Sequence, residues 1–125
     1  MSVGLIIGMT LRQWGLIDAS MDNDASVETV NGNRQRADLA RSIRKAGLDQ
    51  LFRWTSGVPG PGSWPLPDEI VKPKLTIAQW LLTIDVLERW AAAADRTGRH
   101  EAAAQERELR ELILSRLQAH GVHTH

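Results

Sequence analysis

The feature that most constrains this chain is the long apolar stretch from Thr76 to Gly98, TIAQWLLTIDVLERWAAAADRTG. Thr76 and Gln79 have the spacing of a capping box, in which each side chain bonds the backbone amide of the other residue. A glycine commonly stands just past a helix end, where it takes a left-handed conformation. The stretch therefore predicts a helix that begins after Thr76 and stops before Gly98.

This helix is apolar around more of its circumference than a single neighbour can cover. Its large side chains recur at the spacing of three and four that marks a buried helical face. Leu82 and Val86 widen that face and leave only a narrow polar stripe. Such a helix needs cover on more than one side. The residues of the main apolar face are Ile77, Trp80, Leu81, Ile84, Leu87, Trp90, Ala91 and Ala94.

A second helix is predicted directly after Gly98, over Arg99 to His120. Its other sides are charged, and its predicted inward face consists of Ala102, Leu109, Leu112, Ile113 and Leu117. Because only a short turn separates the two helices, they must lie antiparallel. Residues 76–120 are therefore expected to form a helical hairpin.

The start of this hairpin is similar in sequence to a stretch near the N-terminus, TLRQWGLID, which begins at Thr10. The shared Thr-x-x-Gln-Trp pattern predicts a second helix start at Thr10. Gly15 and the polar run over residues 18–33 favour a brief helix followed by a loop. Residues 1–9 alternate apolar side chains with a period of two and are expected to form an extended arm.

The middle of the chain is predicted to contain a basic helix and an irregular connector. Asn33 is the expected N-cap of the helix, and Gly47 is expected to break or end it, with a second short helix over 48–54. All five prolines fall in the connector, residues 55–75. Prolines remove backbone donors, so neither a helix nor a central strand is expected there.

The chain of 125 residues is long enough for one compact domain. The predicted fold class is all-α, a small helical bundle of three to five helices. It is built on the C-terminal hairpin and carries the extended N-terminal arm. The 15 basic and 15 acidic side chains cancel, so no global field favours nucleic acid or an anionic membrane.

The basic helix over residues 34–45 offers candidate nucleic-acid contacts at Arg34, Arg41, Arg44 and Lys45. Phosphate contacts of this kind are electrostatic and depend on salt. The competing interpretation is a solvated helix face that the acidic segment before it balances. Residues 37–59 are faintly similar to the opening of repressor-type helix-turn-helix domains. The run that follows, GPGSWPLP, cannot form a recognition helix, so no base-reading residues are carried over.

Two clusters contain side chains of the kinds that bind metals, and neither has the full pattern of a metal site. Asp22, Asp24, Ser26 and Glu28 alternate like the start of a calcium loop, but Val27 stands where that loop needs glycine. A solvated loop is the favoured interpretation. His120, His123 and His125 lack a carboxylate to orient them, and a polar terminus is favoured. No cofactor, metal or catalytic residue is predicted.

These observations favour a non-enzymatic helical interaction subunit of a larger assembly or a homo-oligomer. The alternative is a nucleic-acid-binding accessory protein that uses residues 34–45, and a small enzyme or metal-binding protein comes third. The chain has no cysteine, and its one short apolar run, residues 3–9, cannot span a bilayer, so a cytoplasmic protein without a membrane contact is expected. The expected protein interface consists of Leu82, Val86, Trp90, Leu5 and Ile7.

Overall fold

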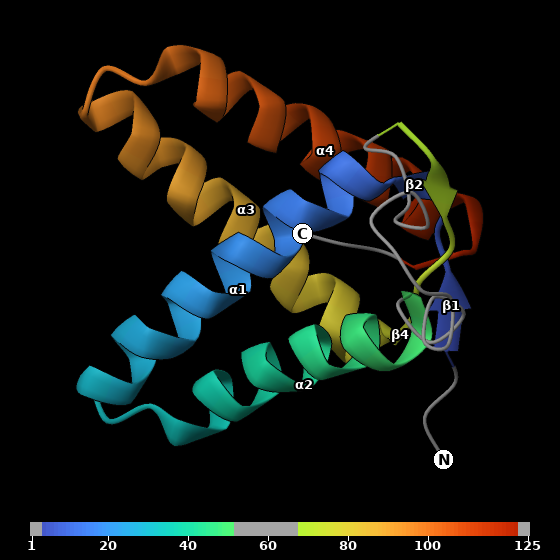
Figure 1. Cartoon of the computed structure of the whole chain (residues 1–125), viewed down its shortest axis with the longest axis horizontal. Helices are drawn as coiled ribbons and strands as arrows, with labels where there is room; N and C mark the ends of the chain where they lie inside the picture. The colour runs from blue at the N-terminus through green and yellow to red at the C-terminus, as the bar shows by residue number, and fades with distance from the viewer. Residues whose placement is uncertain (1–3, 52–67, 123–125) are drawn as a thin grey trace, which may run out of the picture.

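The computed structural model describes residues 4–51 and 68–122, which form four helices and a small amount of sheet (Figure 1). The predicted all-α bundle with a C-terminal helical hairpin is confirmed. The helices are α1 (Leu11–Val30), α2 (Arg34–Leu51), α3 (Ile77–Arg96) and α4 (His100–Ala119). The strands are β1 (Gly4–Ile6), β2 (Met9–Thr10), β3 (Ile70–Val71) and β4 (Lys74–Thr76).

The strands form a short antiparallel ribbon at one end of the molecule. β1 pairs with β4 and β2 pairs with β3, with Leu5 opposite Leu75 and Met9 opposite Val71. The described part of the N-terminal arm is therefore extended, as expected. The end of the predicted connector is not irregular, because Val71 and Leu75 alternate with exposed lysines and are buried under the ribbon. The rest of the connector, with Trp64, lies outside the described residues.

The chain contains the same strand–helix–helix unit twice. Thr10 and Thr76 lie 66 residues apart, and each is the N-cap of a helix with both capping-box hydrogen bonds present. Gly32 and Gly98 have the same separation, and both turn with a positive φ, of 82° and 80°. The register agrees, because the pair Gly4–Thr76 corresponds to the pair Ile70–Thr10. The two units are thus related by an approximate twofold axis that passes near the middle of the ribbon.

Each unit is a helical hairpin, and the two hairpins spread apart toward their turns (Figure 1). Within each unit α1 packs along α2 and α3 packs along α4, while α1 and α3 contact each other between the units. Buried positions recur at the same separation, as in Trp14 and Trp80, or Met21 and Leu87. The twofold relation therefore extends from the caps to the core.

Two sequence predictions about the first unit were wrong. The helix that begins at Thr10 is not brief, because it continues to Val30 and buries Ile17, Met21 and Ala25 along one face. Gly47 does not break α2, which runs unbroken through it. The continuity of α2 also removes the turn that a helix-turn-helix opening would need there. Asn33 does cap this helix, since its side-chain oxygen accepts a hydrogen bond from the Arg36 amide at 3.3 Å.

A buried carboxylate joins three of the helices. Asp24 on α1 is 0% exposed and accepts hydrogen bonds from Arg36 on α2, at 2.9 and 3.1 Å, and from Arg89 on α3, at 2.9 Å. Arg89 also donates to Glu28 at 2.7 Å, and this bond lowers the pKa of the Glu28 carboxyl. Since an unpaired buried charge is costly, Asp24 fixes α2 and α3 relative to α1.

The ring of Trp80 occupies the centre of the core, where it is 0% exposed. Its Nε1 donates a hydrogen bond of 2.9 Å to the backbone oxygen of Leu5, which ties α3 to β1. We expect Trp80→Ala to lower the free energy of unfolding by about 3–5 kcal/mol, because it opens a cavity and frees the Leu5 carbonyl. Trp90→Ala is the matched control, since Trp90 is only partly buried. Urea unfolding measures both variants, and equal midpoints would contradict this assignment of the core.

Candidate functional site

A groove of about 490 Å³ lies between the outer faces of α1 and α2. Residues 11–18, at the beginning of α1, form one wall of the groove, and residues 44–48 of α2 form the other. Trp14 is buried in its own hairpin, whereas Leu48 is 65% exposed at the rim. Concave surfaces of this size with mostly apolar walls are typical of binding sites. The lining residues are Leu11, Trp14, Gly15, Asp18, Arg44, Lys45 and Leu48.

Two glycines shape this region in different ways. A Cβ atom on Gly47 would overlap with the indole ring of Trp14, so only glycine allows the ring to lie against α2. A Cβ atom on Gly15 would meet nothing within 4 Å, because this position faces open space. In the second unit Leu81 and Ile113 occupy the corresponding positions. The fold itself therefore does not require a groove.

The two equivalent tryptophans are used differently. Trp80 points its Nε1 at the strand ribbon, through the hydrogen bond to Leu5. Trp14 instead lies against Gly47 and lines the groove. The position of Gly47 is Ile113 in the second unit, and a side chain at position 47 would overlap with the Trp14 ring as it lies here.

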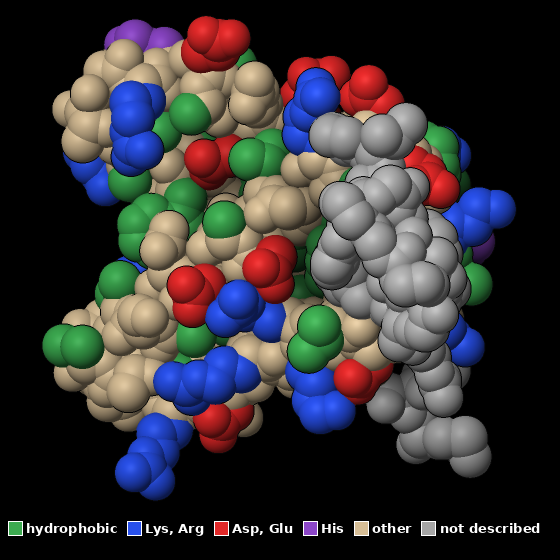
Figure 2. Space-filling view, in the orientation of Figure 1, with side chains coloured by type: hydrophobic (Ala, Val, Ile, Leu, Met, Phe, Trp, Pro, Cys, Tyr) green, Lys and Arg blue, Asp and Glu red, His purple; other side chains and the backbone are tan. Residues whose placement is uncertain are grey.

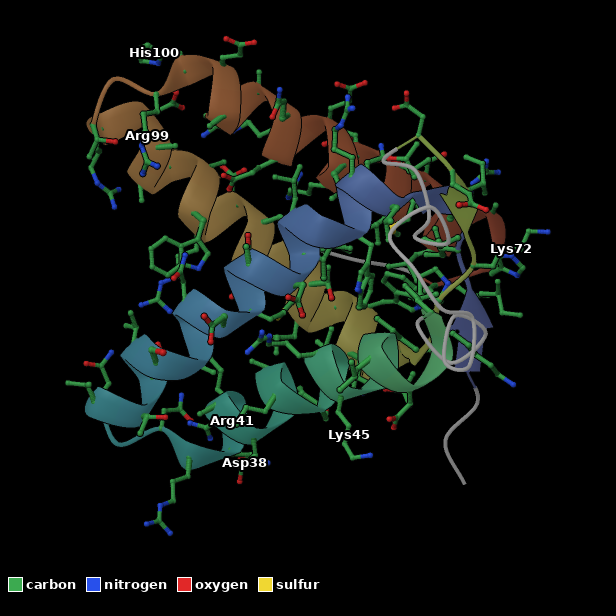
Figure 3. All side chains as sticks on the ribbon, viewed as in Figure 1. Asp38, Arg41, Lys45, Lys72, Arg99 and His100 are labelled. Carbon is green, nitrogen blue, oxygen red and sulfur yellow. The ribbon has the colours of Figure 1, made fainter. Side chains whose placement is uncertain are left out.

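The charged groups at the rim are paired with one another. The Arg44 guanidinium donates to Asp18 through Nε and to Asp22 through Nη1, each at 3.0 Å. The hydrogen bond to Asp18 raises the pKa of Arg44 most, and the negative charges of Asp18 and Asp22 raise it further. Lys45 donates to Asp49 at 2.8 Å and points away from the body of the protein (Figure 3). Each cation at the rim therefore has an aspartate beside it, in ion pairs that remain largely exposed to water, with the Lys45 side chain 75% exposed.

The structure brings two of the four predicted nucleic-acid contacts, Arg44 and Lys45, to this groove. Arg41 lies beside Asp38 on α2, with an ion pair of 3.2 Å, and also donates to the Thr29 hydroxyl at 2.7 Å (Figure 3). Arg34 is exposed at the start of the helix. Positive and negative side chains alternate over the face of α1 and α2 that Figure 2 shows. A continuous basic stripe is absent from this face of the described residues.

Two of the five residues of the expected protein interface lie in the core. Val86 and Ile7 are 0% and 1% exposed and belong to the core that both units build. Leu5, Leu82 and Trp90 pack against that core and are partly buried. A partner would reach Val86 or Ile7 only if the hairpins separated, whereas the other three side chains are partly accessible as they stand.

The acidic cluster that resembles the start of a calcium loop is helical, and all three of its carboxylates are bonded to arginines, Glu28 to Arg89 at 2.7 Å. Asp24 pairs with Arg36 and Arg89, and Asp22 pairs with Arg44. Over residues 4–51 and 68–122, no group of three His, Asp or Glu side chains is placed to hold a metal ion. Of the three C-terminal histidines, His123 and His125 lie outside this range. No helix in the same range is long and apolar enough to cross a membrane.

Comparison with known proteins adds no relative: no family model, no curated protein and no solved structure matches the chain. Its function must therefore be inferred from the geometry of the groove. The sequence did not predict this groove, because a glycine such as Gly15 within a helical segment indicates only a weak or short helix. The contrast between Gly15 and Leu81 in the two repeated units is the signal that would have found it.

Substitution of the two glycines by alanine tests the geometry of the groove. We expect Gly47→Ala to destabilise the protein by about 1–3 kcal/mol, because the added methyl group forces the Trp14 ring to move. Gly15→Ala should instead stabilise it by about 0.5–1 kcal/mol, since alanine favours a helix and meets no neighbour here. Thermal unfolding of the two variants gives the signs. Stabilisation by both substitutions would show that Trp14 does not lie on Gly47.

Proposed function

We propose that this chain is a non-enzymatic interaction protein, a small helical subunit that binds a partner protein through the groove between α1 and α2. The observation that supports this most is the groove itself, about 490 Å³ in volume, with exposed Leu48 beside Trp14. Tryptophan is enriched at the energetic centres of protein interfaces. In this groove Trp14, only 2% exposed, forms the floor, and a partner would contact chiefly Leu48, which is 65% exposed at the rim.

A partner on α1 and α2 is favoured over one on α3. Most of the apolar face of α3 is covered by α4, by α1 and by the ribbon, through contacts that include the Trp80 hydrogen bond, and Leu81 is its one large side chain that is as much as 41% exposed. Self-association remains part of the proposal, with the groove as the contact surface. The cytoplasmic location expected from the sequence stays a prediction.

Nucleic-acid binding is the second possibility, and the ion pairs of α2 weigh against it. Arg41, Arg44 and Lys45 each pair with an aspartate, so a phosphate would have to displace a carboxylate that is already in place. The net charge of zero gives no long-range attraction. We expect no electrophoretic shift of DNA or RNA at low salt. A shift that the double variant Arg41→Glu and Lys45→Glu removes would support this alternative instead.

The proposed function is tested by a substitution that places in the groove the side chain found at the equivalent position of the second unit. Gly15→Leu copies Leu81 and should block the groove while leaving the core unchanged. Ala19→Leu is the matched control, because Ala19 is exposed on the same helix and does not line the groove. Each variant is purified from its native cells under gentle conditions, and the co-purifying proteins are identified and then rebound as pure components.

We expect one protein partner to bind the native chain and the Ala19→Leu control equally. Its affinity for Gly15→Leu should fall at least about tenfold, which corresponds to about 1.4 kcal/mol. Equal binding to all three proteins would contradict the groove as the binding site. The loss of binding to the control as well would show that α1 binds through another face.

A further inference from the structure

We infer that the N-terminal edge of the ribbon, residues 4–10 of β1 and β2, binds an extended, acidic segment of a partner protein as a third strand. This edge does not line the groove between α1 and α2, so the inference is independent of the proposed function. It is carried by the backbone groups of the edge, by the contrast with the opposite edge and by the cations that border the ribbon.

Two residues of the N-terminal edge direct their backbone N–H and C=O groups away from the ribbon. Lys74, which lies opposite Ile6, donates its N–H to the Gln50 side chain at 2.7 Å and accepts a bond from it at 2.8 Å. The Ile6–Lys74 pair is therefore not hydrogen-bonded, and both residues point these groups outward. Gly8 follows Ile6 by two positions and points the same way. No described residue bonds these groups of Ile6 and Gly8, and both residues are exposed, Ile6 to 54%.

The opposite edge of the ribbon, formed by β3 and β4, is protected against the addition of a strand. It carries Lys72, Pro73 and Lys74, and lysine and proline are residues that block strand pairing at the edges of natural sheets. The Gln50 side chain also bonds Lys74 as a neighbouring strand would. The N-terminal edge has neither a charge nor a proline over residues 4–9. The twofold relation thus joins one blocked edge to one that is available for pairing.

The charges around the ribbon favour an acidic partner. Arg116 stands in the second unit where Gln50 stands in the first, so the twofold relation places it beside Gly8. Lys72 and Lys74 are exposed, and Lys72 points away from the body of the protein (Figure 3). None of these three cations forms an ion pair with a described carboxylate, whereas most cations of the helices do. A carboxylate on an added strand therefore gains a partner without displacing another.

A peptide matches this edge better than a nucleic acid or a second copy of the chain. Ile6 and Gly8 each offer one donor and one acceptor, and an extended peptide supplies the complementary acceptor and donor. Phosphate oxygens only accept hydrogen bonds, so they leave both carbonyl groups unmatched. The same edge of a second copy supplies no carboxylate and brings a second Arg116 close to the first. The occupant is therefore an acidic peptide segment.

A capped heptapeptide of alternating valine and glutamate serves as the probe, added to the full-length native chain. Binding is followed by NMR through the backbone amide signals of Ile6 and Gly8 and through the hydrogen exchange of these amides. We expect saturable shifts of both signals, and exchange slowed at least about tenfold at saturating peptide. The same peptide with lysine in place of glutamate should bind at least about tenfold more weakly.

Three variants separate the backbone contact from the charge. Gly8→Pro removes the Gly8 donor at a strand edge, where proline is tolerated, and should weaken binding at least about tenfold. Gly8→Ala is the matched control, because it keeps the donor and its Cβ atom meets only the Ile70 side chain, at 3.9 Å. It should bind as the native chain does. Arg116→Glu should weaken binding of the glutamate peptide and strengthen binding of the lysine peptide. Thermal unfolding shows that each variant is folded.

Four results would overturn the inference. The first is the absence of saturable shifts at Ile6 and Gly8, and the second is equal binding of the peptide to Gly8→Pro and Gly8→Ala. The third is equal affinity of the native chain for the glutamate and lysine peptides, which would contradict an acidic partner. The fourth is tighter binding of single-stranded DNA than of the peptide at the same two amides, which would assign the edge to nucleic acid.

Discussion

The buried carboxylate of Asp24 is the constraint on which the arrangement of the two hairpins depends. It is fully removed from water and holds arginines from two other helices at once. Because the charge cannot stay buried alone, α2 and α3 must both approach α1 at this point. Asp85 adds a second acceptor for Arg36 at 2.8 Å on the exposed side. The crossing of α1 and α3 in Figure 1 follows from this bonding as well as from apolar packing.

This carboxylate is also where the twofold relation of the chain is broken. Trp90 stands at the position of Asp24 in the second unit, and Ala102 stands at the position of Arg36. The first unit thus uses ion pairs inside and has a groove on its outer faces, whereas the second places Trp90 and Ala102 at these positions and forms its own ion pairs, between Arg107 and the carboxylates of Glu88 and Asp95. The two hairpins share one backbone arrangement, and the first of them carries the groove that is proposed to bind a partner.

Local signals in the sequence predicted the parts of the fold that depend on neighbouring residues. The capping boxes at Thr10 and Thr76 and the turn at Gly98 are formed by residues within a few positions of each other. The length of α1 could not be predicted in this way. Its polar residues Asp24 and Glu28 are stabilised by arginines 12 and 61 positions away, respectively. The strand ribbon was missed for the same reason, since its partners are distant in sequence.

The candidate site was predicted only in part. Arg44 and Lys45 were selected for their charge, and the structure places them at the groove with that charge already paired. Gly15 and Gly47 appeared to be weak points of helices, because a sequence does not show what faces a missing side chain. Aligning the two units position by position would have shown that both glycines replace large apolar residues.

A double-mutant cycle between Asp24 and Arg89 measures the link between the hairpins most directly. The free energies of unfolding of Asp24→Ala, Arg89→Ala and the double variant are compared with that of the native chain. If Asp24 locks α3 onto α1, the two substitutions should be non-additive by about 1–3 kcal/mol. Additive effects, with a coupling near zero, would contradict the role of this carboxylate and the arrangement of the hairpins derived from it.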